Sequence, residues 1–458
     1  MRIVICGAGQ VGYGIAERLA AENNDVSVID SSPELVENIQ DKLDVRGHVG
    51  HGSHPDVLAR AGAEEADMII AVTLYDEVNM VACQVAHSLF NVPTKIARIR
   101  AQSYLQPHWS NLFSRDHMPI DVIISPEIEV GDVILRRIAL PGARDVVLFA
   151  QDRIAMVAIE CDDDCPVVDT PLSQLSELFP DLRATVVGIW RNGVMISPRS
   201  SDQILKGDLA YVIAERSQIR RTLGIFGKER PEASRIVLAG GGNIGVYLAL
   251  AIEQRMPGAR VKVIERSREV AIRMADKLKR TVVLHGSALD EQMLVEAGAP
   301  NADLMVAITN DDQVNILSSV LAKKLGCAAN LALLNNSGYH GFTRSLGIDD
   351  YINPRQVTIS RVLQHVRRGR IRGVYSLQNG AAEIIEAEAL DTSPLVGKPL
   401  RDLHLPAGIR IGAIYHGDTV IQPTGDCVIK PKDRIVILAL NERVRQVEQM
   451  FRVSLEFF

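Results

Sequence analysis

Short apolar runs alternate with helical patterns along most of the chain. Val26–Ile29 and Met68–Val72 are runs of β-branched and aliphatic residues that lie between such helical segments. In the first helical segment Val11, Ile15 and Leu19 recur every fourth residue, which places them on one face of a helix. This alternation is typical of βαβ units, so it predicts parallel sheets covered by helices.

The pattern occurs twice. The run "RIVICGAGQVG", which begins at Arg2, matches "RIVLAGGGNIG", which begins at Arg235. The likeness continues far beyond these runs and keeps the same order of polar residues in both copies. Asp67, Thr73, Asp76 and Asn79 of the first copy pair with Asp303, Thr309, Asp312 and Asn315 of the second. Chance does not preserve such an order, so the chain is predicted to be an internal repeat.

A smaller repeat follows each copy. Thr185–Ala214 resembles Arg410–Ala439, and both read as three apolar strands joined by a polar hairpin tip and a second turn. The runs "TPLSQL" and "KPLRDL", which come before them, each predict the start of a helix. The charged segment Leu223–Ser234, which contains Gly and Pro, is the predicted hinge between the halves.

Each copy opens with a glycine-rich turn between a strand and a helix. Gly7, Gly9 and Gly12 form G-x-G-x-x-G, and Asp30 ends the next strand. Gly7 permits a tight turn, Gly9 lets the backbone approach a pyrophosphate, and Gly12 lets helix and strand pack closely. The helix N-terminus supplies free N–H groups, and Asp30 is placed to accept hydrogen bonds from a ribose. The motif therefore predicts a nucleotide site.

Gly240, Gly242, Gly245 and Glu265 repeat every part of this motif in the second copy. With both copies, the fold class is predicted to be α/β, with two tandem units. Each unit is a Rossmann-like doubly wound parallel sheet followed by a small α+β C-terminal lobe. The predicted boundaries are 1–125 and 126–223 in the first unit, and 232–353 and 354–453 in the second.

The acid at the end of the second strand narrows the range of nucleotides that the site could bind. A carboxylate at the ribose repels a 2′-phosphate and so disfavours NADP, but it does not separate NAD from ATP or ADP. In the run "IARIR", Arg98 and Arg100 follow a later strand, where they either bind a phosphate or lie on the surface. The matching run Leu331–Asn336 has no arginine, so we expect the two sites to differ in affinity or preferred nucleotide.

Composition limits the other possibilities. The chain has 458 residues, of which 47% are hydrophobic, and this length predicts two to four domains. A net charge of −6 argues against a general nucleic-acid binder. Six cysteines form neither a disulfide framework nor a zinc motif. No apolar run approaches the ~18–20 residues of a membrane span, and no leader is recognisable, so we expect a cytoplasmic protein.

Each of three further motifs has two interpretations, one as a functional site and one as an ordinary structural feature. His48, His51 and His54 could suggest a metal, but a solvated loop is the favoured interpretation. The run "CDDDC" (Cys161–Cys165) could hold a cation or form a redox pair, against a solvated loop, which is again favoured. The basic run His365–Gly373 could contact phosphate or an acidic partner, or be a solvated helix end.

The sequence lacks the residues that a dehydrogenase normally uses for catalysis. A dehydrogenase needs an acid/base that a carboxylate orients, and the modules after each nucleotide motif offer no such pair. His404 and His416 have no counterpart in the first module. An NAD-dependent enzyme with unrecognised catalytic residues remains the alternative, and steady NADH turnover with a small metabolite would support it.

Together these motifs resemble the TrkA family, the cytosolic regulatory subunits of bacterial Trk potassium uptake systems, built from tandem RCK domains. The resemblance rests on the doubled glycine motif and on "AVTLYDEVNM", "AITNDDQVNI", "IARIR" and "DRIVIL", and it covers essentially the whole chain. It implies a non-enzymatic protein that binds NAD or NADH, or ATP and ADP, and couples a conformational change to gating. It further implies a homo-oligomer, a tetrameric ring, on the inner face of the cell inner membrane. The implied partner is an integral membrane potassium-translocating subunit of the TrkH or TrkG type.

The resemblance also implies site residues in both halves. In the first site these are Gly7, Ala8, Gly9, Gln10, Val11, Gly12, Asp30, Thr73, Leu74 and Arg98. In the second they are Gly240, Gly241, Gly242, Asn243, Ile244, Gly245, Glu265, Thr309 and Asn310. This chain departs from the family near Asn335 and Asn336, where such proteins often have a basic residue.

Overall fold

The computed structural model describes residues 1–179, 181–343, 345–366 and 371–451. The chain forms two compact units, each assembled from both halves of the sequence. The first unit contains Met1–Asp132 and Ser234–His365, and the second contains Val133–Ala233 and the chain from Val366 onward. The predicted division into tandem α/β halves is confirmed, because both halves have the same series of sheets.

The first half opens with a parallel six-stranded sheet in the order β3-β2-β1-β4-β5-β6. The order reverses between β1 and β4, where both strands point their carboxyl ends at the same edge. In such sheets a ligand binds in the crevice beyond that edge. The strands are β1 (Arg2–Cys6), β2 (Asp25–Asp30), β3 (Arg46–Val49), β4 (Met68–Ala71), β5 (Thr94–Arg98) and β6 (Val122–Ile124). The connecting helices are α1 (Gln10–Ala21), α2 (Pro33–Lys42), α3 (Pro55–Arg60) and α4 (Asp76–Phe90).

The second half repeats this sheet in the order β14-β13-β12-β15-β16-β17, strand for strand. Its strands are β12 (Arg235–Ala239), β13 (Arg260–Glu265), β14 (Val282–His285), β15 (Leu304–Ala307), β16 (Asn330–Leu333) and β17 (Asp350–Ile352). Its helices are α8 (Asn243–Arg255), α9 (Arg268–Ala275), α10 (Glu291–Ala297) and α11 (Asp312–Lys324).

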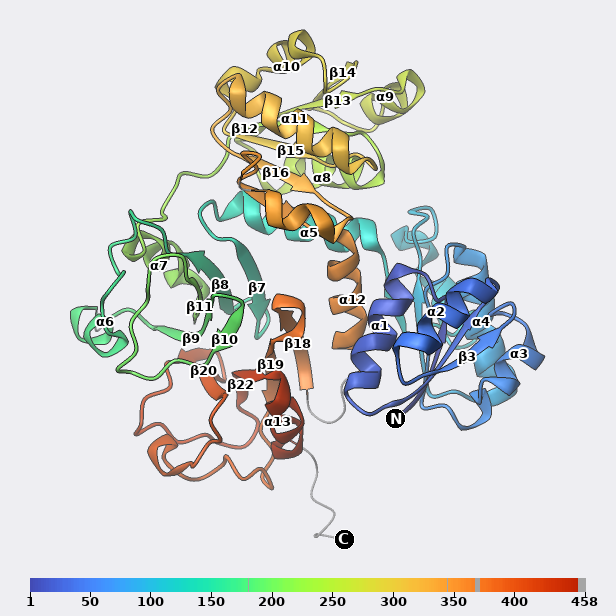
Figure 1. Cartoon of the computed structure of the whole chain (residues 1–458), viewed down its shortest axis with the longest axis horizontal. Helices are drawn as coiled ribbons and strands as arrows, with labels where there is room; N and C mark the ends of the chain where they lie inside the picture. The colour runs from blue at the N-terminus through green and yellow to red at the C-terminus, as the bar shows by residue number, and fades with distance from the viewer. Residues whose placement is uncertain (180, 344, 367–370, 452–458) are drawn as a thin grey trace. The chain divides into compact units, whose positions relative to one another are not determined.

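The helix that follows each parallel sheet packs against the other half. In the first unit, α12 (Pro354–Gln364) lies along α1 (Figure 1). A Cβ on Gly14 of α1 would lie 2.4 Å from the terminal methyl of Ile359, so a larger residue here would push this side chain aside. Reciprocally, α5 (Pro126–Ala139) meets α8, where the Tyr247 hydroxyl donates to Asp132 at 2.8 Å. These reciprocal contacts join the two parallel-sheet lobes.

The second unit is built from two antiparallel five-stranded sheets, in the orders β10-β9-β11-β8-β7 and β18-β19-β22-β20-β21. One buried cluster draws on both sheets, so the two small lobes share a core. Leu438 packs against Gly188, and Ile213 against Gly412, at places where a Cβ would be too close. The first sheet consists of β7 (Asp145–Phe149), β8 (Ile154–Glu160), β9 (Ala184–Arg191), β10 (Val194–Ile196) and β11 (Leu209–Glu215). The second consists of β18 (Ile371–Leu377), β19 (Ala382–Glu388), β20 (Ile409–His416), β21 (Thr419–Ile421) and β22 (Arg434–Leu440).

Two sequence predictions about this unit are wrong. "TPLSQL" does begin helix α6 (Leu172–Leu178), but "KPLRDL" forms only a 3-10 turn at Leu400–Asp402. Pro406 follows closely, and a proline disfavours helical geometry in the residue before it, so no longer helix forms. The remaining helices of this unit are α7 (Ile219–Ile225) and α13 (Val444–Met450).

The hinge also begins later than Leu223. That residue lies in α7, and both Leu223 and Phe226 are buried in the core of the first small lobe. The connection therefore starts at Gly227, whose φ of +69° marks the turn out of the lobe. The predicted hinge segment is correct only from that residue to Ser234.

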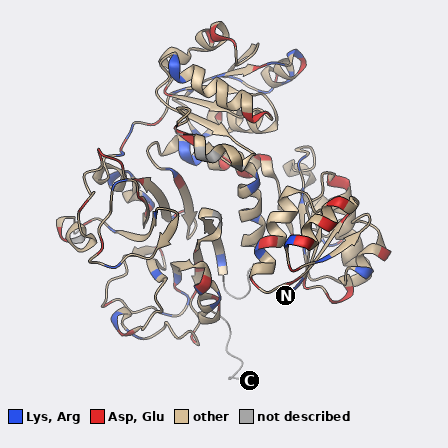
Figure 2. Cartoon of the chain, viewed as in Figure 1, with Lys and Arg blue, Asp and Glu red and all other residues tan. Residues whose placement is uncertain are grey.

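Charges are mixed in both units: Figure 2 shows acidic and basic residues interspersed along each of them. Among the described helices, none combines the length and the apolar character that a membrane span requires.

Candidate nucleotide-binding sites

The first glycine motif forms the turn from β1 into α1. Gly7 has φ +112°, a left-handed conformation that suits glycine, and its N–H donates to the Ile29 carbonyl at 2.7 Å. A Cβ on Gly12 would lie 1.8 Å from the carbonyl oxygen of Gly7, so only glycine lets the helix lie this close to the turn. A Cβ on Gly9, in contrast, would meet nothing within 4 Å. The space over Gly9 is open, and the first N–H groups of α1 face outward from this end of the helix.

Asp30 holds this turn in place. Its carboxylate accepts hydrogen bonds from the Ala8 N–H at 2.7 Å and from the Ser32 N–H at 2.9 Å. It thus ties the glycine-rich loop to the start of α2. A carboxylate has about four lone-pair sites, so acceptor capacity is left for a ribose diol.

A buried asparagine fixes the edge of the site at the end of β4. Asn79, on α4, has no solvent exposure. Its side-chain oxygen accepts from the Thr73 N–H and hydroxyl, both at 2.8 Å. Its amide donates to the carbonyls of Thr73 at 3.2 Å and Arg98 at 2.9 Å. Thr73 is therefore held rigidly, while Leu74 beside it is 74% exposed.

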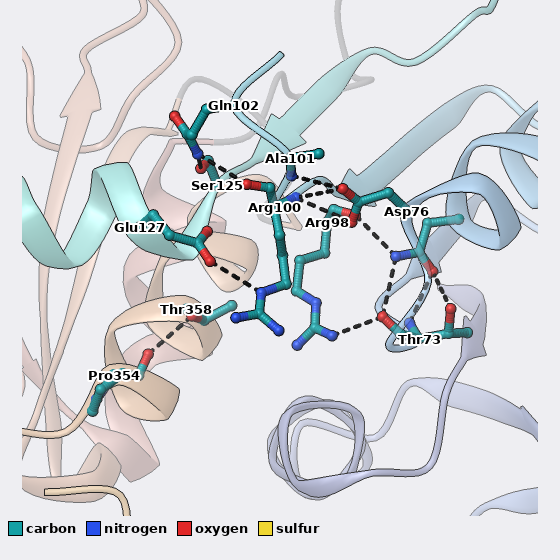
Figure 3. Close-up of polar contacts among 11 residues, drawn as sticks. Thr73, Asp76, Arg98, Arg100, Ala101, Gln102, Ser125, Glu127, Pro354 and Thr358 are labelled. Carbon is teal, nitrogen blue, oxygen red and sulfur yellow. Dashed lines mark hydrogen bonds and ion pairs between the residues drawn. The ribbon is translucent and has the colours of Figure 1, made fainter. Parts of the chain in front are cut away.

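Arg98 and Arg100 extend from the end of β5 beside this edge, with their guanidinium groups next to each other (Figure 3). Arg98 is only 8% exposed, and its guanidinium donates to the Thr73 carbonyl at 2.7 Å. Its Nε is buried and has no hydrogen-bond partner among the described residues. Burial lowers the pKa of Arg98, and the neighbouring Arg100 lowers it further. A buried guanidinium with an unused donor suits an anionic ligand.

Arg100 is more exposed and is bound by a carboxylate. Its Nε donates to Glu127 at 3.0 Å (Figure 3), while its backbone N–H donates to Asp76 at 2.9 Å. Arg100 and Leu74 also line a small open hollow of about 270 Å³, together with Asn243 of α8. Arg100 therefore lies between the first site and the beginning of the second glycine-rich helix. For this reason Arg100 is not assigned to the first site alone.

The second motif has the same geometry. Gly240 has φ +116°, and a Cβ on Gly245 would lie 2.2 Å from the Gly240 carbonyl oxygen. A Cβ on Gly242 would again meet nothing within 4 Å. Glu265 accepts from the Gly241 N–H at 2.6 Å, and also from the Ser267 N–H at 2.7 Å. Asn243 and Ile244 are the first residues of α8, as Gln10 and Val11 are of α1.

The edge of the second site has the same hydrogen bonds as the edge of the first, so these bonds show which residues of the two halves are equivalent. Asn315 accepts from the Thr309 N–H at 2.9 Å and donates to the Leu333 carbonyl at 2.9 Å. Leu333 therefore stands where the first half has Arg98, and Asn310 follows Thr309 as Leu74 follows Thr73. Asn335, whose N–H donates to Asp312 at 2.9 Å, stands where the first half has Arg100.

Glu127, the acid that binds Arg100, has a basic residue at the matching position of the second half. Helices α5 and α12 both begin with proline after the last parallel strand, and the next residue is Glu127 in one and Arg355 in the other. Sequence reasoning missed this exchange, because it compared only the two β5-type runs. Arg266 and Arg268, which come shortly after Glu265 and so lie near the ribose end of the second site, are exposed.

Sequence reasoning also left the supporting residues without a role. It paired Asp76 with Asp312 and Asn79 with Asn315, but the structure shows that these side chains hold the ends of the strands. Their recurrence at equal spacing in both halves was the available signal. Asn79 and Asn315 lie inside their helices and are wholly buried, which is typical of such a structural role.

The histidine run and the basic run, which the sequence offered as other candidate sites, lie outside the two nucleotide sites. His48 belongs to β3 rather than to a loop, and the rings of His51 and His54 stack at 4.8 Å. Among the described residues, no three His, Cys, Asp or Glu are grouped as a metal would need. The basic run His365–Gly373 lies partly outside the described residues, at 367–370; its Arg372 pairs with Glu388.

Comparisons with known proteins agree along the whole chain. The model of the TrkA-N domain matches residues 3–126 and 236–354, and that of the TrkA-C domain matches residues 156–227 and 384–452. The Trk system potassium uptake protein TrkA of Azorhizobium caulinodans is 62% identical, with 100% of both chains covered. The protein of the same name from Halomonas elongata is 42% identical, also with 100% of both covered.

Solved structures support the fold alone. The GsuK RCK domain superposes with a TM-score of 0.61 at 18% identity, covering 98% of this chain and 94% of that one. The GsuK channel bound to NAD gives the same TM-score and identity, with 98% and 78% covered.

Proposed function

Since the chain belongs to the TrkA family, we propose that it is the non-enzymatic regulatory subunit of a potassium uptake system, controlled by nucleotides that bind at two sites. The observation that carries this proposal is the paired open turn: at both Gly9 and Gly242 a side chain would project into free space, whereas Gly12 and Gly245 are closed by backbone. Two such turns, each next to a held carboxylate, suit a diphosphate and a ribose.

The proposed ligands are NAD or NADH, and ATP or ADP. In the first site the N–H groups at the start of α1 would bind the pyrophosphate, and Asp30 the ribose diol. Arg98 would add a guanidinium to a phosphate through its unused Nε. In the second site Gly241, Gly242 and Glu265 would take the same roles.

The phosphate-binding cation would differ between the sites. The first has Arg98 at the end of its strand, while the second has Leu333 there and Arg355 on the following helix. An arginine on α12 belongs to the element that packs on α1 of the other half. Nucleotide in the second site would therefore act on the contact between the two lobes.

Regulation would follow from that contact. A ligand shifts a conformational equilibrium only through its different affinity for the two states. Helix α1 carries the first glycine turn at one end and α12 against its side, so a ligand-dependent shift of α1 would be felt by the other half. Assembly as a homotetramer on the inner face of the membrane, under a potassium-translocating subunit of the TrkH or TrkG type, would add these shifts together.

Titration calorimetry of the full chain with NAD, NADH, ATP and ADP tests the proposal. We expect saturable binding, lost at one site in Gly9→Val and at the other in Gly242→Val, with no NADH consumption in the presence of metabolites. The alternative of an NAD-dependent enzyme would be established by steady turnover. No binding of any of the four nucleotides would contradict the proposal.

A further inference from the structure

A small hollow lies beside the first glycine turn, where β4 and β5 end. Its volume is about 270 Å³, and its lining includes residues that follow these strands: Leu74 and Tyr75 after β4, and Arg100 and Ala101 after β5. Asp76 fixes the wall between the two strand ends, because its carboxylate accepts from the Arg100 N–H at 2.9 Å and from the Ala101 N–H at 2.8 Å. The hollow is therefore built on firmly held backbone.

Two large apolar side chains are exposed at this hollow. Leu74 is 74% exposed and Tyr75 is 66% exposed, and the charged residues Glu77 and Arg100 belong to the same lining. Single exposed apolar residues are common on protein surfaces and need no explanation. An adjacent pair with a polar rim, in the crevice where a parallel sheet binds its ligand, is instead typical of a binding surface.

The second half keeps the backbone of this segment but not its side chains. The Thr73 hydroxyl donates to the Tyr75 carbonyl at 3.2 Å, and the Thr309 hydroxyl donates to the Asp311 carbonyl at 3.2 Å. The two residues after the threonine are Leu-Tyr in the first half, however, and Asn-Asp in the second. The apolar pair is therefore a property of the first site and is not required by the fold.

Tyrosine is also a poor residue for the start of α4. Asp311 caps the matching helix α11, because its carboxylate accepts from the N–H groups of Gln313 at 2.8 Å and Val314 at 3.1 Å. Among the described residues, the side chain of Tyr75 caps nothing at the start of α4. An aspartate at this position would make the first turn of the helix more stable. A residue that weakens its own helix, yet is exposed at a ligand crevice, indicates a function in binding.

We propose that Tyr75 and Leu74 bind the nicotinamide ring, so that the first site prefers the dinucleotides NAD and NADH to ADP and ATP. This inference rests on the proposed nucleotide sites. In a doubly wound sheet a dinucleotide lies across the point where the strand order reverses, which here is between β1 and β4. Asp30, at the end of β2, lies on one side of that point, and the hollow, at the ends of β4 and β5, lies on the other. The two halves of a dinucleotide therefore each have a place.

The chemistry of the hollow suits a flat ring. A tyrosine ring and a leucine side chain offer an apolar face on which an aromatic ring stacks. The hollow is smaller than the ~300–1,000 Å³ pockets that enclose a drug-sized ligand, so it has room for one ring rather than for a second nucleotide. ADP and ATP carry no ring beyond their phosphates, so they gain nothing from Tyr75. The asparagine and aspartate of the second half offer no apolar face, so we expect no preference there.

Titration calorimetry of the full chain tests the proposal by comparing NADH with ADP-ribose, which has the same adenosine, diphosphate and second ribose but no nicotinamide. The first site is measured in Gly242→Val and the second in Gly9→Val, so that the other site is silent each time. We expect NADH to bind about tenfold more tightly than ADP-ribose at the first site, and equally tightly at the second. Equal affinities at the first site, or the same preference at both sites, would overturn the proposal.

Variants of Tyr75, each combined with Gly242→Val, assign the preference to its ring. Tyr75→Ala should abolish the preference while ADP affinity stays within about twofold, and Tyr75→Phe should keep it. Tyr75→Asp should abolish the preference and raise the melting temperature, because it caps α4. Trp109→Ala is the matched control, since Trp109 is another exposed aromatic residue of this lobe and lies outside the lining of the hollow. A loss of preference in Trp109→Ala as large as in Tyr75→Ala would contradict the assignment.

The outcomes separate this inference from the proposed function. If ADP binds at the first site and a preference for NADH survives in Tyr75→Ala, the role of Tyr75 is refuted and the nucleotide site stands. If ADP, ADP-ribose and NADH all fail to bind there, both proposals are contradicted.

Discussion

Arg98 gives the sharpest prediction, because the structure separates its contribution to binding from its contribution to stability. In Arg98→Leu the first half acquires the residue that the second half has at Leu333. We expect nucleotide affinity at the first site to fall while the unliganded chain stays at least as stable. The reason is that Arg98 is a buried cation with an unused donor before any ligand binds.

The magnitude follows from the contacts. A charge-assisted hydrogen bond to phosphate contributes about 1.5–3 kcal/mol, so its loss weakens binding by about ten- to hundred-fold. Among the described residues, the Arg98 side chain donates only to the Thr73 carbonyl, which also accepts from Asn79 at 3.2 Å and so keeps a partner. Replacing a poorly paired buried charge with a leucine of suitable volume is typically neutral or stabilising.

The assay is calorimetric titration of the full chain with ADP at two salt concentrations, with thermal unfolding recorded in parallel. Gly242→Val is present throughout to silence the second site. Arg46→Leu is the matched control, since it makes the same change in charge on exposed β3. Arg355→Leu tests the proposed cation of the second site, and it is combined with Gly9→Val so that the first site is silent. Unchanged affinity and salt dependence in Arg98→Leu would refute the reasoning, as would a lower melting temperature without a loss of binding.

The remaining predictions concern the glycine turn and its supports. Gly9→Val should abolish nucleotide binding at its site without loss of stability. Gly12→Ala should instead lower the free energy of unfolding by roughly 2 kcal/mol or more, because its Cβ would overlap a carbonyl oxygen. Denaturant unfolding distinguishes the two variants. Asp30→Ala should weaken binding by about 1.5–3 kcal/mol, and Asp30→Asn by less, because an amide oxygen still accepts a hydrogen bond; equal affinities in calorimetry would remove the ribose role. Asn79→Ala should cost about 1–3 kcal/mol of stability, since it leaves the partly buried Thr73 N–H without its acceptor, and urea unfolding with no change in midpoint would contradict it.

The sequence was sufficient for most of the elements and for the position of the two glycine-rich turns. A G-x-G-x-x-G motif after an apolar strand specifies backbone geometry almost by itself, as the closed contacts at Gly12 and Gly245 show. Repetition of the whole pattern then predicted two parallel sheets and two small lobes. The local requirement for glycine explains this success, because no other residue fits those positions.

Contacts between distant elements could not be predicted. An apolar stripe on α12 indicates that the helix is buried, but it does not say that Gly14 of α1 is its partner. Nor did the pattern show that Arg98 is buried, since an arginine at a strand end is usually exposed. The exchange of Glu127 for Arg355 was hidden for the same reason: both residues lie in the first turn of helices whose packing was unknown.

Potassium flux through reconstituted vesicles tests the central claim most directly. The membrane potassium-translocating subunit from the same genome is reconstituted with this chain, and flux is measured with ATP, ADP, NAD or NADH. The account predicts that flux depends on which nucleotide is present, and that Gly9→Val combined with Gly242→Val removes this dependence while the chain still binds the vesicles. Flux that is the same with every nucleotide, or a dependence that survives both substitutions, would contradict it.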